Sequence, residues 1–324
     1  MKNLRYLFAA GLVLAAVSCQ KDDEPAGGNE RDEQDQAVLM PSQEGSGEID
    51  GYRLVWEDTF DGDALDETAW NIEVTGSPAN NEIQYYIRRN VSVGTDSVSG
   101  RHCLILTAKK EKYGSRYFTS GRVNSLGKKY FKHGKVEALI KLPKTYKGLW
   151  PAFWMMGNDY KKVGWPKCGE IDILEMGNSG GFGTVAKSER YLNGACHWGY
   201  YKDGAYPNYA QSSTYSYSVQ DGEYHLFTLI WDDDAINTYI DLDKYPSAKP
   251  YYSIGITVPD DGPHDLGTCW DTGCYFHKEA FILFNLAVGG HFPGITDPDG
   301  ITALNAANGY EASMYVDYVR VYQK

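Results

Sequence analysis

Three acidic side chains fall within six residues of one short apolar run. Glu170, Asp172 and Glu175 lie in the sequence Gly-Glu-Ile-Asp-Ile-Leu-Glu-Met. Alternate residues of a strand share a face, so Glu175 joins the other two only if a β-bulge around Ile173 and Leu174 adds one residue. Three carboxylates on one face repel each other and are costly to desolvate. Glycoside hydrolysis needs two carboxyl groups with separated pKa values, whereas the run alone also fits a polar edge or a metal site.

A tryptophan-rich apolar run lies just upstream of the acids, and both belong to a series of short strand-like segments. Gly, Asn, Asp and Pro separate these segments from residue 52 onward. The predicted strands are 101–110, 134–142, 150–156, 170–176, 225–232, 236–242, 280–288 and 313–322. The sequence contains no amphipathic helical pattern of ten or more residues, no internal repeat and no second domain. Many short strands joined by turns predict an all-β sandwich or barrel.

The composition also excludes one class of partner. The chain has 324 residues, with 35 Gly, 26 Tyr and 8 Trp, and a formal net charge of −12. Residues 20–50 hold ten acidic and two basic residues, so the remainder is only mildly acidic. Phosphate binding needs a basic face, and we therefore expect no nucleic-acid partner. The many aromatic rings suit either the core or a surface that stacks on the apolar faces of sugars.

The N-terminus has the pattern of a targeting segment. A basic start, an apolar stretch and small residues predict a signal peptide over 1–18. Cys19 follows the small residues in a resemblance to a bacterial lipobox, with Ala16 where leucine is usual; an ordinary signal peptide is the alternative. The acidic residues after Cys19 resemble the tag of surface-exported lipoproteins of Bacteroidetes-like bacteria. We expect an outer-membrane lipoprotein exposed on the cell surface, held only through its lipid anchor.

The segment 19–50 reads as an acidic flexible tether, because it has too few apolar residues to form a core. The domain then covers 51–324. If Cys19 is acylated, five cysteines remain, and an odd number excludes complete pairing within the chain. Cys269 and Cys274 flank a turn-like sequence that a short disulfide could close. Cys103 lies in a strand-like run and is predicted to be a buried free thiol. No CxxC or Cys/His spacing indicates zinc.

Ordered motifs along nearly the whole of 51–324 resemble glycoside hydrolase family 16, and within it the laminarinase-like branch with a bulged acid motif. The matching segments are 55–62, 80–86, 119–123, 148–156, the acid run, His197-Trp198, 284–290 and 315–322. The resemblance implies a curved β-jelly-roll sandwich of the concanavalin A-like lectin and glucanase type. Its substrate cleft is expected on the concave face.

By this resemblance Glu170 is the nucleophile and Glu175 the general acid/base of a retaining mechanism. Such a mechanism places the two carboxyl groups about 5–5.5 Å apart. Asp172 is expected to hydrogen-bond to one or both, and its negative charge to help keep Glu175 protonated. No cofactor is expected for catalysis.

Substrate contacts are expected from eight further side chains. They are Asn81, Arg122, Trp150, Trp154, Trp165, His197, Trp198 and Asn285. Core packing is the alternative for Trp154, and a structural role is the alternative for Arg122 and His197.

The resemblance also implies a structural calcium ion on the convex side, where Asp317 would supply a side chain and Gly100 a backbone oxygen. The acid often found in the N-terminal motif is replaced here by Thr59, although Asp58 is next to it. With Thr59 in place of that acid, one of the calcium ligands that the resemblance implies is missing.

The acid motif and its flanks fit an endo-acting β-glucanase that hydrolyses β-1,3-glucan or mixed-linkage β-1,3/1,4-glucan. Two aromatic loop regions, 198–207 and 259–274, differ from a plain glucanase and could wall a cleft that selects a different sugar. The alternative function is therefore an endo-β-galactosidase on mucin-type O-glycans or related galactans. A carbohydrate-binding relative without catalysis is a further alternative. The expected partner is a polysaccharide substrate, and the expected state is a monomer.

Overall fold

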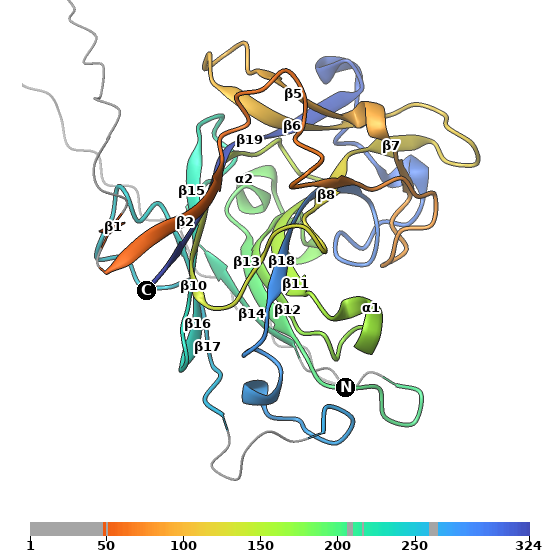
Figure 1. Ribbon diagram of the computed structural model, residues 1–324. Coiled ribbons are helices and arrows are strands. Elements are labelled where there is room, and N and C mark those ends of the chain that lie inside the picture. The colour runs from red at the N-terminus through yellow and green to blue at the C-terminus, as the bar shows by residue number, and fades with distance from the viewer. Residues whose placement is uncertain (1–47, 50, 206–209, 216, 259–264) are drawn as a thin grey trace, which may run out of the picture. The chain divides into compact units, whose positions relative to one another are not determined.

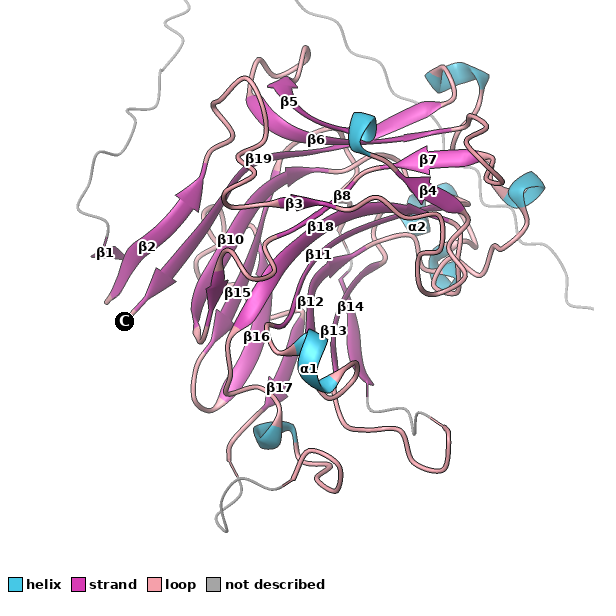
Figure 2. Ribbon diagram, turned by 45° about the vertical axis from the view of Figure 1, so that its right-hand side comes forward, coloured by secondary structure: helices cyan, strands magenta, loops and turns pink. Residues whose placement is uncertain are grey.

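The computed structural model describes residues 48–49, 51–205, 210–215, 217–258 and 265–324. Within these residues two β-sheets dominate, and the helices are single turns (Figure 1, Figure 2). None of the described helices is long and apolar enough to cross a membrane. The predicted signal peptide, Cys19 and the tether up to residue 47 lie outside the described residues.

The larger sheet has eleven strands, and all of its pairs are antiparallel except β4 with β7. Its main path runs β17-β16-β15-β10-β19-β6-β7-β4, with β1, β2 and β5 attached beside it. The strands are β1 (Glu48–Ile49), β2 (Tyr52–Asp58), β4 (Gln84–Tyr86), β5 (Val91–Thr95), β6 (His102–Lys109), β7 (Phe118–Ser120), β10 (Gly134–Lys141), β15 (His225–Trp231), β16 (Ala235–Ile240), β17 (Tyr252–Gly255) and β19 (Glu311–Gln323).

The smaller sheet has eight strands in the order β14-β13-β12-β11-β18-β8-β3, and β9 also pairs with β18. The strands are β3 (Asn71–Ile72), β8 (Arg122–Asn124), β9 (Tyr130–Phe131), β11 (Leu149–Gly157), β12 (Glu170–Glu175), β13 (Leu192–His197), β14 (Ala210–Tyr215) and β18 (Ala280–Val288). Strands β11 and β18 are central and almost wholly buried, as their continuous apolar sequences predict.

One hydrophobic core lies between the two sheets. Val136 and Leu229 contribute to it from the larger sheet, and Phe153, Ile171 and Phe284 from the smaller one. Phe153 stacks on Phe284 with ring centroids 4.8 Å apart, which couples the central strands β11 and β18 on their core side. The alternation of strand side chains then sends residues of the opposite parity to the outer face of the smaller sheet.

The structure confirms the predicted all-β sandwich and each of the eight predicted strands, with ends shifted by at most two residues. It also confirms the disulfide between Cys269 and Cys274 and the buried free thiol of Cys103. The only described helices are α1 (Tyr160–Val163), α2 (Val185–Ser188) and short 3-10 turns, in agreement with the absence of a helical pattern.

Candidate active site

The three acids of β12 share the outer face of the smaller sheet because the strand carries a bulge. Along β13, Asp172 pairs with Ala195 and Glu175 with Asn193, so three steps on β12 match two steps on the neighbouring strand. On the other side, Phe153 pairs with Leu174 and Trp154 with Asp172, which leaves Ile173 as the extra residue. The predicted bulge is therefore present, and it returns Glu175 to the face of Glu170 and Asp172.

The remaining side chains of β12 hold the strand on the core. Ile171, Ile173 and Leu174 are at most 2% exposed and belong to the core between the sheets. Their burial anchors the acid-bearing face, so the carboxyl groups are fixed by a central strand rather than by a loop.

Glu175 lies in a low-polarity position beside one strong donor. It is 8% exposed, and its Oε1 accepts a 3.0 Å hydrogen bond from Nε1 of Trp150 on β11. The Trp150 ring stacks on Phe292 at 4.8 Å. Burial and the nearby charge of Glu170 raise the pKa of Glu175 to about 8, and the hydrogen bond from Trp150 opposes part of that rise. Glu175 is therefore protonated at neutral pH.

Glu170 is only partly buried and has cationic neighbours. It pairs with His197 across the β12–β13 ladder. Burial raises the pKa of Glu170, while His197, a hydrogen bond from Trp165 and the charge of Arg122 lower it. Glu175 has no such cationic neighbour among the groups that shift its pKa. The two glutamates therefore differ in a defined direction, with Glu170 favoured as the ionised member.

Asp172 lies between the two glutamates and is 4% exposed. Burial, and then the charges of Glu170 and Glu175, raise the pKa of Asp172 well above its usual range. This shift opposes the expected negative charge on Asp172, because three buried acids at this spacing are costly to ionise together. The charge that keeps Glu175 protonated comes from Glu170.

His197 places an imidazole ring beside the acids. Its Nε2 lies 3.5 Å from Oδ2 of Asp172, which is too long for a strong hydrogen bond. Neither Nδ1 of His197 nor Oδ2 of Asp172 has a hydrogen-bond partner in the described part of the protein. Both atoms are thus buried polar atoms whose hydrogen-bonding capacity is not used by the described residues.

Arg122, Trp154 and Asn285 form a second group on the same face. Nε1 of Trp154 donates to Oδ1 of Asn285 at 2.8 Å, and the Arg122 guanidinium lies 5.1 Å from the centre of the Trp154 ring. Nε of Arg122 is 3.1 Å from Oε2 of Glu73. The indole of Trp154 is only partly buried and packs against a small hydrophobic cluster separate from the core between the sheets, so both substrate contact and packing stay open for it.

The two neighbouring tryptophans Trp165 and Trp198 occupy different places. The ring of Trp165 lies 6.0 Å from His197 and 6.1 Å from the exposed Tyr201, on the acid-bearing face. Trp198 is 5% exposed, belongs to the core, and donates from Nε1 to the backbone oxygen of Trp270 at 2.9 Å. The expectation that Trp198 contacts substrate is therefore corrected, because its indole packs inside the sandwich.

Asn81 is exposed and lies next to His291, which the sequence analysis did not predict as a site residue. Its Nδ2 lies 2.6 Å from Nε2 of His291, and the backbone N–H of His291 donates to the oxygen of Asn80 at 2.8 Å. These contacts join the segment before β4 to the one after β18. Phe292, next to His291, is the ring on which Trp150 stacks.

Asn193 is a second residue that the sequence reading missed. It pairs with Glu175 across β13, is 5% exposed, and its Nδ2 has no hydrogen-bond partner among the described residues. Alternate residues of a strand share a face, so Asn193, four residues before His197, lies on the face of the acids. This spacing was the sequence signal that could have identified Asn193.

The expected calcium ligands form a different arrangement. Oδ2 of Asp317 accepts a 2.6 Å contact from the guanidinium of Arg101, next to Gly100. A guanidinium in that position already balances the carboxylate, and Asp317 is in neither group of three metal-ligating side chains found among the described residues. This ion pair changes the environment expected for calcium, and the ion stays a prediction.

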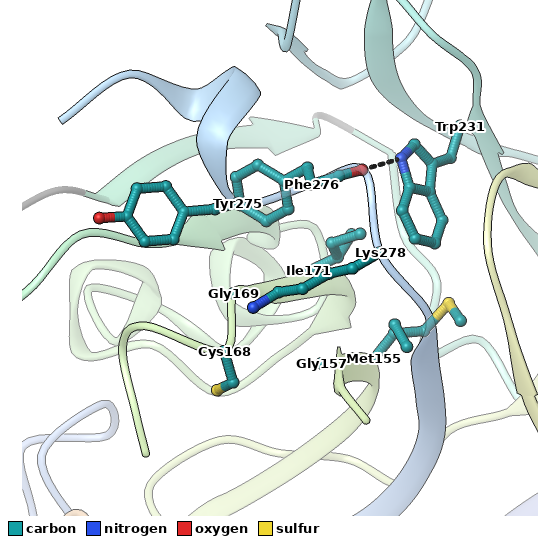
Figure 3. A pocket seen from close by; sticks show the side chains of 10 residues that line it. Met155, Gly157, Cys168, Gly169, Ile171, Trp231, Tyr275, Phe276 and Lys278 are labelled. Atoms are coloured by element: carbon teal, nitrogen blue, oxygen red, sulfur yellow. Dashed lines mark hydrogen bonds between the residues drawn. The ribbon is translucent and has the colours of Figure 1, made fainter. Parts of the chain in front are cut away.

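A small cavity lies on the core side of β12, away from the acids. Its volume is about 10 Å³, enough for about one water molecule and far too small for a sugar (Figure 3). The lining residues are Met155, Gly157, Cys168, Gly169, Ile171, Trp231, Tyr275, Phe276, Lys278 and Ala280. The acid-bearing outer face is therefore the candidate site.

The model of the glycosyl hydrolases family 16 matches residues 82–273, more than half of the chain. A solved structure, the glycoside hydrolase family 16 endo-glucanase from Bacteroides ovatus with G4G3G-2F-DNP, is 39% identical, with a TM-score of 0.67. That match covers 83% of this chain and 100% of the other. The glucan endo-1,3-beta-glucosidase of Cryptopygus antarcticus is 32% identical over 74% of this chain and 82% of its own length.

The glucan endo-1,3-beta-glucosidase A1 of Niallia circulans is 29% identical over 90% of this chain. The chain spans between a third and two fifths of the length of the first curated relatives that it matches. The matches therefore leave more than half of each of these two relatives uncovered.

Proposed function

The chain belongs to the glycosyl hydrolases family 16, and from this membership we propose that it is an endo-acting, retaining β-glucanase in which Glu170 is the nucleophile and Glu175 the general acid/base. The observation that carries this proposal is the electrostatic difference between the two glutamates on one face of β12. Trp165, Arg122 and His197 favour the ionised form of Glu170, whereas burial beside Glu170 favours the protonated form of Glu175.

The proposed reaction follows from this difference. Glu175 gives its proton to the glycosidic oxygen as the bond to the anomeric carbon breaks, and the carboxylate of Glu170 attacks that carbon from the opposite face. A covalent glycosyl-enzyme forms. Glu175, now ionised, takes a proton from water, and the resulting hydroxide releases the sugar from Glu170. Asp172, between the two glutamates, helps to set their protonation through its electrostatic interaction with both.

The proposed substrate is β-1,3-glucan or mixed-linkage β-1,3/1,4-glucan. The Bacteroides and Cryptopygus relatives, which are the more similar in sequence, carry glucanase names that support this class. Trp154, Trp165 and Tyr201 offer rings on the acid-bearing face, where the flat apolar side of a glucose unit can stack. The alternative substrate is a galactan or a mucin O-glycan, and the substrate panel described next distinguishes it from the glucans.

The proposal is tested by incubating the purified protein with β-1,3-glucan, mixed-linkage glucan, agarose and mucin and sizing the products over time. Medium-length oligosaccharides should appear early from the glucans. Glu170→Gln should abolish cleavage and keep glucan binding, while the exposed Glu223→Gln serves as a matched control with full activity. Cleavage by Glu170→Gln at the wild-type rate would overturn the assignment, and glucan binding without cleavage by wild type would identify a binding protein.

We further propose that acylated Cys19 tethers the domain as a monomer to the outer face of the outer membrane. The support is the N-terminal sequence pattern. Incorporation of labelled palmitate by wild type but not by Cys19→Ala would agree with this, and equal labelling of both would contradict it.

A further inference from the structure

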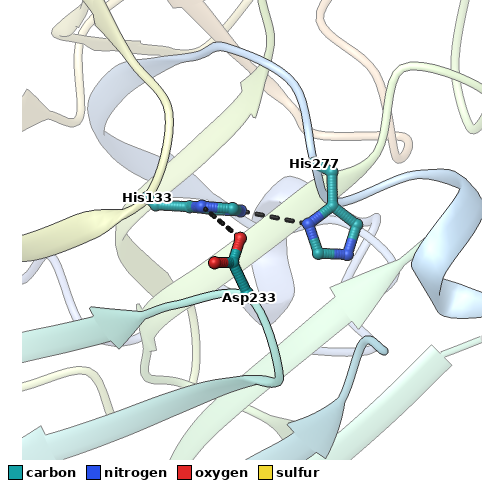
Figure 4. A group of neighbouring side chains, drawn as sticks. All are labelled: His133, Asp233 and His277. Atoms are coloured by element: carbon teal, nitrogen blue, oxygen red, sulfur yellow. Dashed lines mark hydrogen bonds and ion pairs between the residues drawn. The ribbon is translucent and has the colours of Figure 1, made fainter. Parts of the chain in front are cut away.

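A group of metal-ligating side chains lies where three segments meet that are distant in the sequence. His133 lies between β9 and β10, Asp233 in the turn between β15 and β16, and His277 just before β18 (Figure 4). Each residue offers one ligand atom, and these atoms all lie within 4.8 Å of one another. The group uses none of the residues assigned to glycoside hydrolysis.

His277 is held with one nitrogen free to act as a ligand. Its Nε2 lies 2.6 Å from the backbone oxygen of Ile256. A carbonyl oxygen only accepts, so Nε2 carries the proton and Nδ1 presents a lone pair. Metal-binding histidines almost always have their other nitrogen fixed by such an acceptor, which sets the tautomer and the ring orientation.

His133 stands between two acceptors. Its Nε2 lies 3.1 Å from Nδ1 of His277, and its Nδ1 lies 3.2 Å from Oδ1 of Asp233. A neutral imidazole has one N–H and therefore satisfies only one of these neighbours. A cation bound by one atom of each group takes up the lone pair on Nδ1 of His277 and the single lone pair of a neutral His133. Two nitrogens bound at 2.0–2.1 Å to a tetrahedral ion lie about 3.3 Å apart, close to the spacing present here.

The surroundings hold the two histidines in place. The ring of His133 packs edge-on against Trp231 with centroids 5.2 Å apart. Nε1 of the buried Trp231 donates to the oxygen of Phe276, the residue before His277, at 2.9 Å (Figure 3). The indole of Trp231 thus supports both histidines. The Asp233 side chain is 88% exposed, so ions from solvent can reach the three ligands.

We propose that His133, Asp233 and His277 bind one Zn²⁺ ion, with water in the fourth position. Two imidazoles and a carboxylate are a ligand set that Zn²⁺ accepts in tetrahedral geometry, and imidazole favours it over Ca²⁺ or Mg²⁺. The ligands are 100 and 44 positions apart in the chain, so no local spacing in the sequence indicates them.

A bound ion would join three parts of the sandwich. It would link the start of β10, the β15–β16 turn and the segment that follows the disulfide Cys269–Cys274. That segment continues from the loop whose Trp270 stacks on Tyr200 at 3.8 Å. The ion would therefore hold the loop that contains Trp270 in place, and it takes no part in the proposed hydrolysis.

The test is calorimetric titration of the purified, untagged protein with ZnCl₂ after removal of metals by a chelator. Wild type should bind one Zn²⁺ per chain, and its thermal unfolding midpoint should rise in Zn²⁺. His277→Ala should weaken binding by about tenfold or more and remove the thermal shift. Asp233→Asn, a change on an exposed turn that keeps the fold, should also weaken binding.

A matched control separates this group from the other candidate ligands, Glu170, Asp172 and His197. His197→Ala should bind Zn²⁺ with unchanged affinity and stoichiometry. The proposal is overturned if wild type binds no Zn²⁺, if His277→Ala and Asp233→Asn bind it as wild type does, or if His197→Ala alone abolishes binding. Because binding and unfolding are measured without substrate, the result is independent of the hydrolase assignment.

Discussion

Nε1 of Trp150 donates a 3.0 Å hydrogen bond to Oε1 of Glu175, from the strand next to β12. This bond is the one specific polar contact that lowers the pKa of a carboxyl group otherwise raised by burial and by Glu170. The stack of Trp150 on Phe292 fixes the donor from behind. The position and the protonation of Glu175 therefore depend on a residue that has no titratable group.

Replacing Trp150 by Phe keeps a ring for Phe292 and removes the donor. We expect kcat to fall about tenfold, because a hydrogen bond to a carboxyl group contributes about 1.5 kcal/mol. The alkaline limb of the pH profile of kcat/KM should move to higher pH, since the lost bond lowers the pKa of Glu175. A purely structural role for Trp150 would leave that limb in place.

The pH dependence of wild type follows from the two glutamates. The general acid must be protonated, so activity should decline with a midpoint near pH 8, the pKa of Glu175. The nucleophile must be ionised, so the acid limb should lie above the usual glutamate range, because burial raises the pKa of Glu170. A kcat/KM profile that stays flat through pH 9.5 would contradict the assignment of Glu175.

Glu175 should also make stability depend on pH. Its folded-state pKa is about 8, whereas an unfolded glutamate titrates near about 4.3. The folded chain therefore binds the proton more tightly, so this stabilisation is complete below pH 4.3 and is lost as pH rises toward 8. Glu175→Gln should be inactive yet melt at a higher temperature than wild type at pH 8. The difference should vanish near pH 4, and equal melting temperatures at both pH values would argue against a buried neutral carboxyl group.

The positive charge of Arg122 should determine the pH at which kcat/KM falls on the acid side of its pH profile. It contributes to lowering the pKa of Glu170, and its guanidinium lies over the Trp154 ring. Arg122→Met should move the acid limb of kcat/KM up by about one pH unit, as expected for loss of a nearby opposite charge. Arg122→Lys keeps the charge and should leave the limb near its wild-type position. Equal shifts in the two variants would assign the effect to packing with Trp154 and Glu73.

The sequence predicted the strands and the bulge because both follow from periodicity. The spacing of Glu170, Asp172 and Glu175 is incompatible with a regular strand that shows all three on one face, so the extra residue was predictable. The same parity rule applied from His197 would have placed Trp198 in the core and Asn193 beside the acids. A tryptophan in a motif indicates that a large ring is needed at that position. Only the alternation of side chains along the strand indicates on which face of the sheet the ring lies.

Other features depend on contacts between distant segments and were not predictable from local patterns. The raised pKa of Asp172 arises from the burial of three acids together, which one strand's sequence does not determine. The stack of Trp150 on Phe292 and the contact of Asn81 with His291 join segments more than 140 residues apart. The ion pair of Arg101 with Asp317 likewise joins β6 and β19 and changes the environment expected for calcium.

The central claim is that Glu170 attacks the sugar and Glu175 protonates the leaving group. The most direct measurement is the anomeric configuration of the glycosyl azide formed from an activated aryl β-glucoside when azide is added to Glu170→Ala and to Glu175→Ala. Without the Glu170 carboxylate, azide must attack in its place and give the α-azide; without Glu175, azide attacks the glycosyl-enzyme and gives the β-azide. We predict this pair of products. The β-azide from Glu170→Ala together with the α-azide from Glu175→Ala would contradict the account.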